Sequence, residues 1–240
     1  MAATPAQATR GSDRGIYLPA AVGVCALVVV GFWRSYFSKL VAAPSEPLTV
    51  LVHVHGALMT AWVSLFVAQV SLVACGRTDL HRRLGSIGFV LLALIVVVAI
   101  PTIITATRLG GNHMPGPALP SLALVLGLFL EFVILASLAL GYRRRPDVHK
   151  RLMTLAACAA MEAGVARLPL ALLDSATMTH IANDLLPLLI VLVDTIRHRR
   201  LHPAFLWGGL LLVSIQALST WASGTDTWLR IAEGLISHVP

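Results

Sequence analysis

The sequence predicts an all-α membrane protein, a polytopic bundle of seven transmembrane helices with its N-terminus inside and its C-terminus outside. Three observations predict this fold class: an apolar composition, seven long apolar runs, and basic residues gathered in alternate loops. Of the 240 residues, 57% are hydrophobic and 12% are charged, and the mean hydropathy is +0.83. A soluble domain carries about 25% charged residues. The composition therefore leaves no room for a soluble domain of any size.

The apolar runs define the expected domain organisation. A run of about 20 apolar residues is long enough to span a bilayer. The first run is too long for a typical signal-peptide core, so we expect it to be kept as a helix. The expected parts are a cytoplasmic tail (1–15), a seven-helix domain (16–222) and an external tail (223–240). The seven runs cover residues 16–37, 49–75, 84–107, 117–141, 151–174, 178–196 and 203–222.

The basic residues give the expected orientation. With seven helices, the N-terminal tail and the loops after the second, fourth and sixth helices share one face, and these segments hold thirteen of the 18 lysines and arginines. The positive-inside rule places that face in the cytoplasm. Each base there gains about 1 kcal/mol from anionic lipid. We therefore expect the lipid bilayer and its anionic lipid as partners, and no nucleic acid.

A short motif occurs at two of these basic turns. "TDLHRRLG" (78–85) and "PDVHKRLM" (146–153) share Asp, an apolar residue, His, a base, Arg and Leu, and "RHRRLHPAF" (197–205) is a looser third version. Bases alone would orient the chain, so the histidines need another explanation. They could bind a metal, cap helix N-termini, or form hydrogen bonds at the interface. The residues of this expected cytoplasmic-face cluster are His81, His149, Asp194 and His202.

Ionisable residues also stand within the apolar runs, where each is costly and usually faces the bundle interior. An unpaired arginine at such a depth costs on the order of 3 kcal/mol, so we expect Arg167 to contact at least one carboxylate. The small residues of "AACAAMEAG" would let partner helices approach closely. The sequence predicts a polar cavity in the outer half of the bundle, lined by His55, Glu131, Glu162, Arg167, Asp184 and His180.

Three functions fit such a cavity. The first expectation is a redox protein that binds haem b or a metal ion, because haem takes axial histidines and bundle metal sites take carboxylates and histidine; the other two are alternatives. A proton-coupled small-molecule transporter or sensor needs only carboxylates, histidine and an arginine. A membrane scaffold or assembly factor would use the same residues structurally. No nucleophile elbow, P-loop or zinc-protease helix is present, so the sequence does not predict an enzyme. The three cysteines show no CxxC spacing, and a disulfide framework is not expected.

Several longer motifs carry a resemblance to a known family. They are "HVHGALMTAWVSLFVAQVSLVACGRTDLHRRLGSIG", "GFWRSYF", "DVHKRLM", "ARLPL" and "RLHPAFLWGG". Over roughly residues 16–230 the chain resembles an uncharacterised family of seven-helix bacterial inner-membrane proteins. The resemblance implies a multi-pass protein of the bacterial inner (plasma) membrane and no particular activity. There is a looser likeness to transmembrane b-type cytochromes, from which the chain departs by lacking paired histidines well inside two facing helices.

The last residues predict a short helix of a different kind. In "TDTWLRIAEGLISHVP", residues Trp228, Leu229, Ala232, Leu235 and Ile236 follow helical spacing on one side. A segment with one apolar and one polar side lies flat at a membrane surface. We therefore expect an interfacial helix on the outer face.

Overall fold

The computed structural model describes residues 5–42, 48–109 and 117–237, and every regular element in these ranges is a helix. The predicted all-α class is therefore confirmed. The first helix begins at Pro5, ahead of the apolar run that starts at residue 16. The elements are α1 (Pro5–Phe32), η1 (Trp33–Phe37, a π-helix), α2 (Ser38–Val41), α3 (Val50–Ala74), α4 (Thr78–Gly85), α5 (Ile87–Arg108), α6 (Ala118–Gly141), α7 (Pro146–Val165), η2 (Ala171–Leu173, a 3₁₀ helix), α8 (Ala176–His198), α9 (Pro203–Ser223) and α10 (Asp226–Ser237).

Six helical segments in the described ranges are long and apolar enough to cross a membrane. The chain is therefore an integral membrane protein by the length and composition of its helices. These segments are Gly15–Val41, Val50–Ala74, Thr78–Arg108, Ala118–Gly141, Ala176–His198 and Pro203–Ser223. The fifth predicted run, 151–174, is the one that does not qualify.

The structure replaces that run with α7, which starts earlier and ends earlier than predicted. Thirteen of its 20 residues are buried, because α7 packs against α1, α6, α8 and α9. A helix surrounded by other helices needs no lipid-facing apolar surface, so it can carry polar and charged residues. The helix ends at Val165. Pro169 then disfavours a helical conformation at Leu168.

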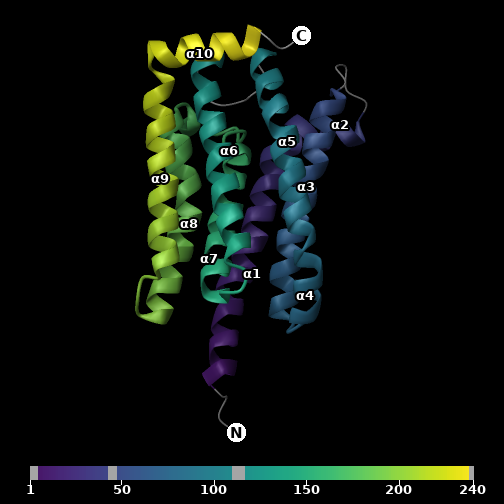
Figure 1. Cartoon of the computed structure of the whole chain (residues 1–240), viewed down its shortest axis with the longest axis vertical. Helices are drawn as coiled ribbons and strands as arrows, with labels where there is room; N and C mark the ends of the chain where they lie inside the picture. Colours follow the sequence, from purple (N-terminus) through teal and green to yellow (C-terminus); the bar gives the residue numbers. More distant parts are fainter. Residues whose placement is uncertain (1–4, 43–47, 110–116, 238–240) are drawn as a thin grey trace.

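Figure 1 shows α8 and α9 on one side of the molecule, α3 and α5 on the other, and α1, α6 and α7 between them. The start of α1 lies at the lower end of the view and the last helix at the upper end. The start of α4, the α6–α7 connection and the α8–α9 connection also lie at the lower end. The basic turns predicted to share a face therefore gather at one end of the bundle, called here the lower end.

Both copies of the repeated motif begin a helix at this lower end. Thr78 opens α4 and Pro146 opens α7, with Asp79 and Asp147 in the first turns. A carboxylate in the first turn is stabilised by the partial positive charge of the helix N-terminus. Proline at the first position costs no hydrogen bond there. The motif is therefore explained in part as a helix start.

Glycine allows α1 and α7 to come into backbone contact. A methyl group placed on Gly31 would lie 2.6 Å from the carbonyl carbon of Gly164 and closer still to its oxygen. Such a contact leaves no space for any side chain at residue 31. The small residues of α7 thus serve the close packing that the sequence predicted for this helix.

The final helix, α10, lies across the upper end of the bundle (Figure 1). Its Trp228 indole N–H donates to the carbonyl oxygen of Leu119 on α6 at 3.1 Å, and Ala232 is fully buried. Ile231 and Leu235 are 50% and 39% exposed. The predicted helix is present over Asp226–Ser237, and of its predicted apolar side Ala232 is buried while Leu235 is exposed. The apolar surface of α10 is therefore divided between the bundle and its surroundings.

Candidate functional site

The buried carboxylate of Glu162 is the centre of a polar network near the upper end of α7. Glu162 is 0% exposed. Its Oε1 lies 2.5 Å from Nδ1 of His180 on α8, and its Oε2 accepts a hydrogen bond from the Asn183 amide at 3.3 Å. Nε2 of His180 lies 3.4 Å from the hydroxyl of Thr220 on α9. Three helices therefore hold one carboxylate–imidazole pair away from water.

Two further carboxylates lie near this pair. Asp184, also on α8, accepts a hydrogen bond from the Gln216 amide of α9 at 3.2 Å. Glu131 on α6 is 1% exposed, and its Oε2 has no hydrogen-bond partner within the described ranges. Glu131 is close enough to Glu162 and Asp184 to interact with both electrostatically. We name Glu131, Glu162, His180, Asn183, Asp184, Gln216 and Thr220 the upper network.

The structure separates Arg167 and His55 from the upper network. Nη1 of Arg167 donates to the carbonyl oxygen of Ala163, and the guanidinium lies 4.4 Å from the centre of the Phe32 ring on α1. In the described part of the chain Arg167 forms no ion pair with Glu131, Glu162 or Asp184. The expected contact with a carboxylate is therefore wrong.

The reason is that α7 ends before Arg167. The helix stops at Val165, and Arg167 lies in the turn that follows, where its backbone N–H donates to the carbonyl oxygen of Gly164 at 3.1 Å. Depth in the membrane brought Arg167 and Glu162 together in the prediction, but Glu162 stands on the helix and Arg167 on the turn, and the two side chains have different neighbours. His55 of α3 lies within electrostatic range of Arg167, and no group in the part of the chain that the structure describes forms a hydrogen bond with its Nδ1.

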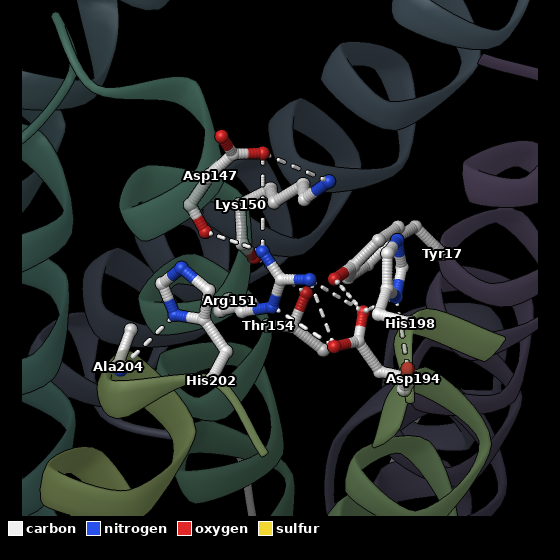
Figure 2. Close-up of polar contacts among 9 residues, drawn as sticks. All are labelled: Tyr17, Asp147, Lys150, Arg151, Thr154, Asp194, His198, His202 and Ala204. Atoms are coloured by element: carbon white, nitrogen blue, oxygen red, sulfur yellow. Dashed lines mark hydrogen bonds and ion pairs between the residues drawn. The ribbon is translucent and has the colours of Figure 1, made fainter. Parts of the chain in front are cut away.

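A second network lies at the lower end and joins α1, α7 and α8. Figure 2 shows the guanidinium of Arg151 directed at the carboxylate of Asp194. Nε of Arg151 donates to Oδ2 at 3.0 Å, and Nη2 lies 3.0 Å from Oδ1 and 2.8 Å from Oδ2. The Tyr17 hydroxyl donates to Oδ1 at 3.0 Å. Arg151 and Asp194 are 3% and 0% exposed. This is a buried, bidentate ion pair with an added hydroxyl donor.

Weaker polar contacts surround this ion pair. Asp147, whose side chain is 74% exposed, forms an ion pair with Lys150 at 3.5 Å, and His198 places Nδ1 3.4 Å from Oδ1 of Asp194. His202 caps α9, because its Nδ1 accepts the Ala204 backbone N–H at 3.1 Å. Burial, and then the nearby Arg151 guanidinium, lower the pKa of His202. The capping role considered for the turn histidines is thus confirmed at His202.

The other two turn histidines pack against each other. The ring centres of His81 and His149 are 6.2 Å apart, and Nδ1 of His149 lies 2.7 Å from the carbonyl oxygen of Ala139. Gln69 of α3 can donate its amide to His81 in the orientation that satisfies both groups. The predicted cytoplasmic-face cluster is therefore two groups: His81 with His149, and Asp194 with Arg151, near which His202 lies.

The described residues contain no group of three or more histidine, cysteine, aspartate or glutamate side chains arranged to hold a metal ion. Haem fits no better. His180 faces Glu162 with one nitrogen and Thr220 with the other, and His55 lies within electrostatic range of the positively charged Arg167. These histidines do not form a facing axial pair. The geometry supports neither of the cofactors that the sequence left open.

Several residues of both networks were missed from the sequence. Arg151 stands in a run of bases and was counted with those that orient the chain. Asn183 is three residues from His180 on α8. Residues three apart lie on the same side of a helix, so this spacing could have predicted that Asn183 belongs to the network. Tyr17 and Thr220 had no signal, because a hydroxyl in an apolar run is common and its partner lies on a distant helix.

Comparison with protein-family models, with curated proteins and with solved structures finds no match to this chain.

Proposed function

We propose that this chain is a proton-coupled membrane carrier, in which the upper network takes up and releases the proton. The buried Glu162–His180 pair supports this most directly. Groups that exchange protons inside membrane proteins are carboxylates and histidines facing the bundle interior. Here an imidazole and a carboxylate are 2.5 Å apart, so one proton can pass between Nδ1 and Oε1 without a change of backbone position.

The absence of a nearby fixed cation favours proton binding over a structural ion pair. Within the described ranges, no lysine or arginine is paired with Glu131, Glu162 or Asp184. An isolated buried charge is expensive, and a carboxyl group without a cation lowers that cost by holding a proton. Three such carboxylates provide several positions between which protons can be exchanged as the helices move.

The position of the network supports a carrier that opens at one end at a time. Asp184 and Asp194 are ten residues apart on α8, about 15 Å along the helix axis. The buried side chains Pro187 and Ile190 of α8 and Leu155 of α7 lie between the two levels. The upper network is thus separated from the lower end by apolar packing, and proton transfer to that end requires rearrangement.

The test is proton movement into vesicles that contain the full-length chain. The vesicles hold a pH-sensitive dye and are given a membrane potential. The internal pH should change faster in vesicles that contain wild-type protein than in protein-free vesicles, in the direction set by the sign of the potential. Glu162→Gln keeps the shape of the side chain and removes its exchangeable proton. We expect proton flux to fall on the order of 100-fold, the low end of what a positioned proton-transfer group contributes.

The matched control is Glu233→Gln, on the exposed side of α10, which should leave the flux unchanged. A flux in wild type equal to that of empty vesicles would refute the carrier. Equal fluxes in wild type and Glu162→Gln would remove Glu162 from the proton path. Infrared difference spectra between high and low pH add a direct readout, since Glu162→Gln should remove one carboxyl band.

We further propose that α7 makes a seventh crossing, shielded by its neighbours, and that the lower end faces the cytoplasm of a bacterial inner membrane. The gathering of basic turns at that end supports this orientation, as does the resemblance to the seven-helix family. Anionic lipid at the lower end and an interfacial position for α10 belong to the same proposal. The exposed Ile231 and Leu235 would then contact the outer lipid surface.

Reporter fusions test this topology. Fusions after Arg145 and Arg200 should report a cytoplasmic location, and a fusion at Gly224 should report an external one. If α7 does not cross, the reporters after Arg145 and Arg200 would lie on opposite sides. If the orientation is reversed, all three reports would be reversed together.

A further inference from the structure

We propose that Arg167 and His55 form a binding site for an oxyanion, a carboxylate or a phosphate group, at the upper end of the bundle. The site lies between α3, the end of α1 and the segment that follows α7. It is distinct from the upper network and does not depend on the proposed proton function. The starting observation is an arginine in a membrane protein whose charge no acidic side chain of the described ranges balances.

The geometry of the guanidinium leaves one particular edge unused. Nη1 is the only nitrogen of Arg167 that donates to a described group, the Ala163 carbonyl oxygen. Nε is buried and has no hydrogen-bond partner among the residues that the structure describes. Nε and Nη2 together form the edge from which arginine donates two parallel hydrogen bonds to a carboxylate or a phosphate. The edge suited to bidentate recognition is therefore the one without an acceptor in those residues.

His55 supplies a second polar group within electrostatic range of Arg167. Its buried Nδ1 also has no hydrogen-bond partner among the described residues. A neutral imidazole that carries its proton on Nδ1 donates one hydrogen bond. An oxyanion can accept from both residues at once, whereas a cation or a neutral apolar ligand would leave the Arg167 charge unbalanced.

The surroundings strengthen the preference for an anion. The Phe32 ring covers one face of the guanidinium at 4.4 Å, which excludes water from that face. Attraction between opposite charges grows as the local dielectric constant falls. No acidic side chain of the described ranges forms an ion pair with Arg167, and two carboxylates of the upper network are held by other partners, Glu162 by His180 and Asp184 by Gln216. The anion that balances Arg167 would therefore come from outside the chain.

Two sources can supply this chemistry. His55 is five residues into α3, about 7.5 Å along the helix from its first residue, a depth that a lipid phosphate of the outer leaflet can reach. A small free oxyanion, such as a carboxylate solute, could reach the same position from water. Both would make the same bidentate contact, so they must be separated by experiment.

The test is binding to full-length protein in an uncharged detergent, with inorganic phosphate and acetate titrated calorimetrically and phosphatidylglycerol followed by native mass spectrometry. Arg167→Lys keeps the positive charge, and with it the fold, but loses the planar fork. We expect this variant to bind at least about tenfold more weakly, because one charge-assisted hydrogen bond is lost. Arg230→Lys, exposed on α10, is the matched control and should bind like wild type.

Each outcome is decisive. Binding of phosphate or acetate that weakens in Arg167→Lys supports the site with a free oxyanion as ligand. Retention of phosphatidylglycerol alone, lost in Arg167→Lys, supports the site with a lipid headgroup as ligand. If wild type binds none of the three probes, or if Arg167→Lys and His55→Ala both bind as wild type does, the proposal is overturned.

Discussion

Replacing Asp194 with alanine is expected to lower the free energy of unfolding by about 3–5 kcal/mol, the cost of leaving a buried ionic partner uncompensated. The change strands the guanidinium of Arg151, which is 3% exposed, and removes the acceptor of the Tyr17 hydroxyl. The measurement is unfolding by titration of sodium dodecyl sulfate into mixed micelles, followed by circular dichroism.

Two companion variants identify the cause of that loss. Asp147→Ala removes an exposed carboxylate that pairs with Lys150 and Arg151 on the same helix, and it should cost no more than about 1 kcal/mol. Replacing Arg151 and Asp194 together with leucine removes both charges, and much of the lost stability should return. The single variants Arg151→Leu and Asp194→Leu provide the comparison. If the double variant loses as much free energy of unfolding as these two together, the ion pair is not the reason for the loss.

The second large effect is expected at the contact between α1 and α7. Gly31→Ala should destabilise the protein by about 3 kcal/mol, the upper part of the range for overpacking. The added methyl group meets the backbone of Gly164, which cannot move as a side chain can. The two helices must separate, and unfolding in the same detergent titration should occur at a lower detergent fraction.

Gly209→Ala is the matched control for this change. A methyl group at residue 209 of α9 meets nothing within 4 Å, and alanine is the better helix former by up to about 1 kcal/mol. This variant should be as stable as wild type or slightly more stable. A Gly31→Ala protein as stable as the Gly209→Ala protein would mean that α1 and α7 do not approach as closely as described.

Much of the fold could be predicted because membrane helices are selected by local properties. Length and apolarity identify the six candidate spans, and the basic turns do gather at one end of the bundle. His180 and Asp184, four residues apart on α8 and both predicted to line the polar cavity, do belong to the same network. These features depend on residues close together in the chain, so neither packing nor long-range partners are needed to recognise them.

The partners of the polar residues could not be predicted in the same way. The sequence placed Glu131, Glu162, Asp184 and His180 at related depths, and the structure brings these four together. Depth said nothing of where the helix ends or which way a side chain points, so Arg167 was assigned to the same group, although it follows the end of α7 and lies over the Phe32 ring. Arg151 was taken for a surface base until α8 supplied Asp194.

The sequence by itself thus determined that this chain is helical, apolar enough for a membrane and basic at one end, because these properties depend on composition and short-range spacing. Tertiary structure alone decided that α7 is the enclosed helix and which charges it meets. By composition α7 does not look like a membrane span, because it carries polar and charged residues. It can carry them because neighbouring helices, and not lipid, surround it. An enclosed helix is defined by what packs around it, and those contacts come from segments far away in the chain.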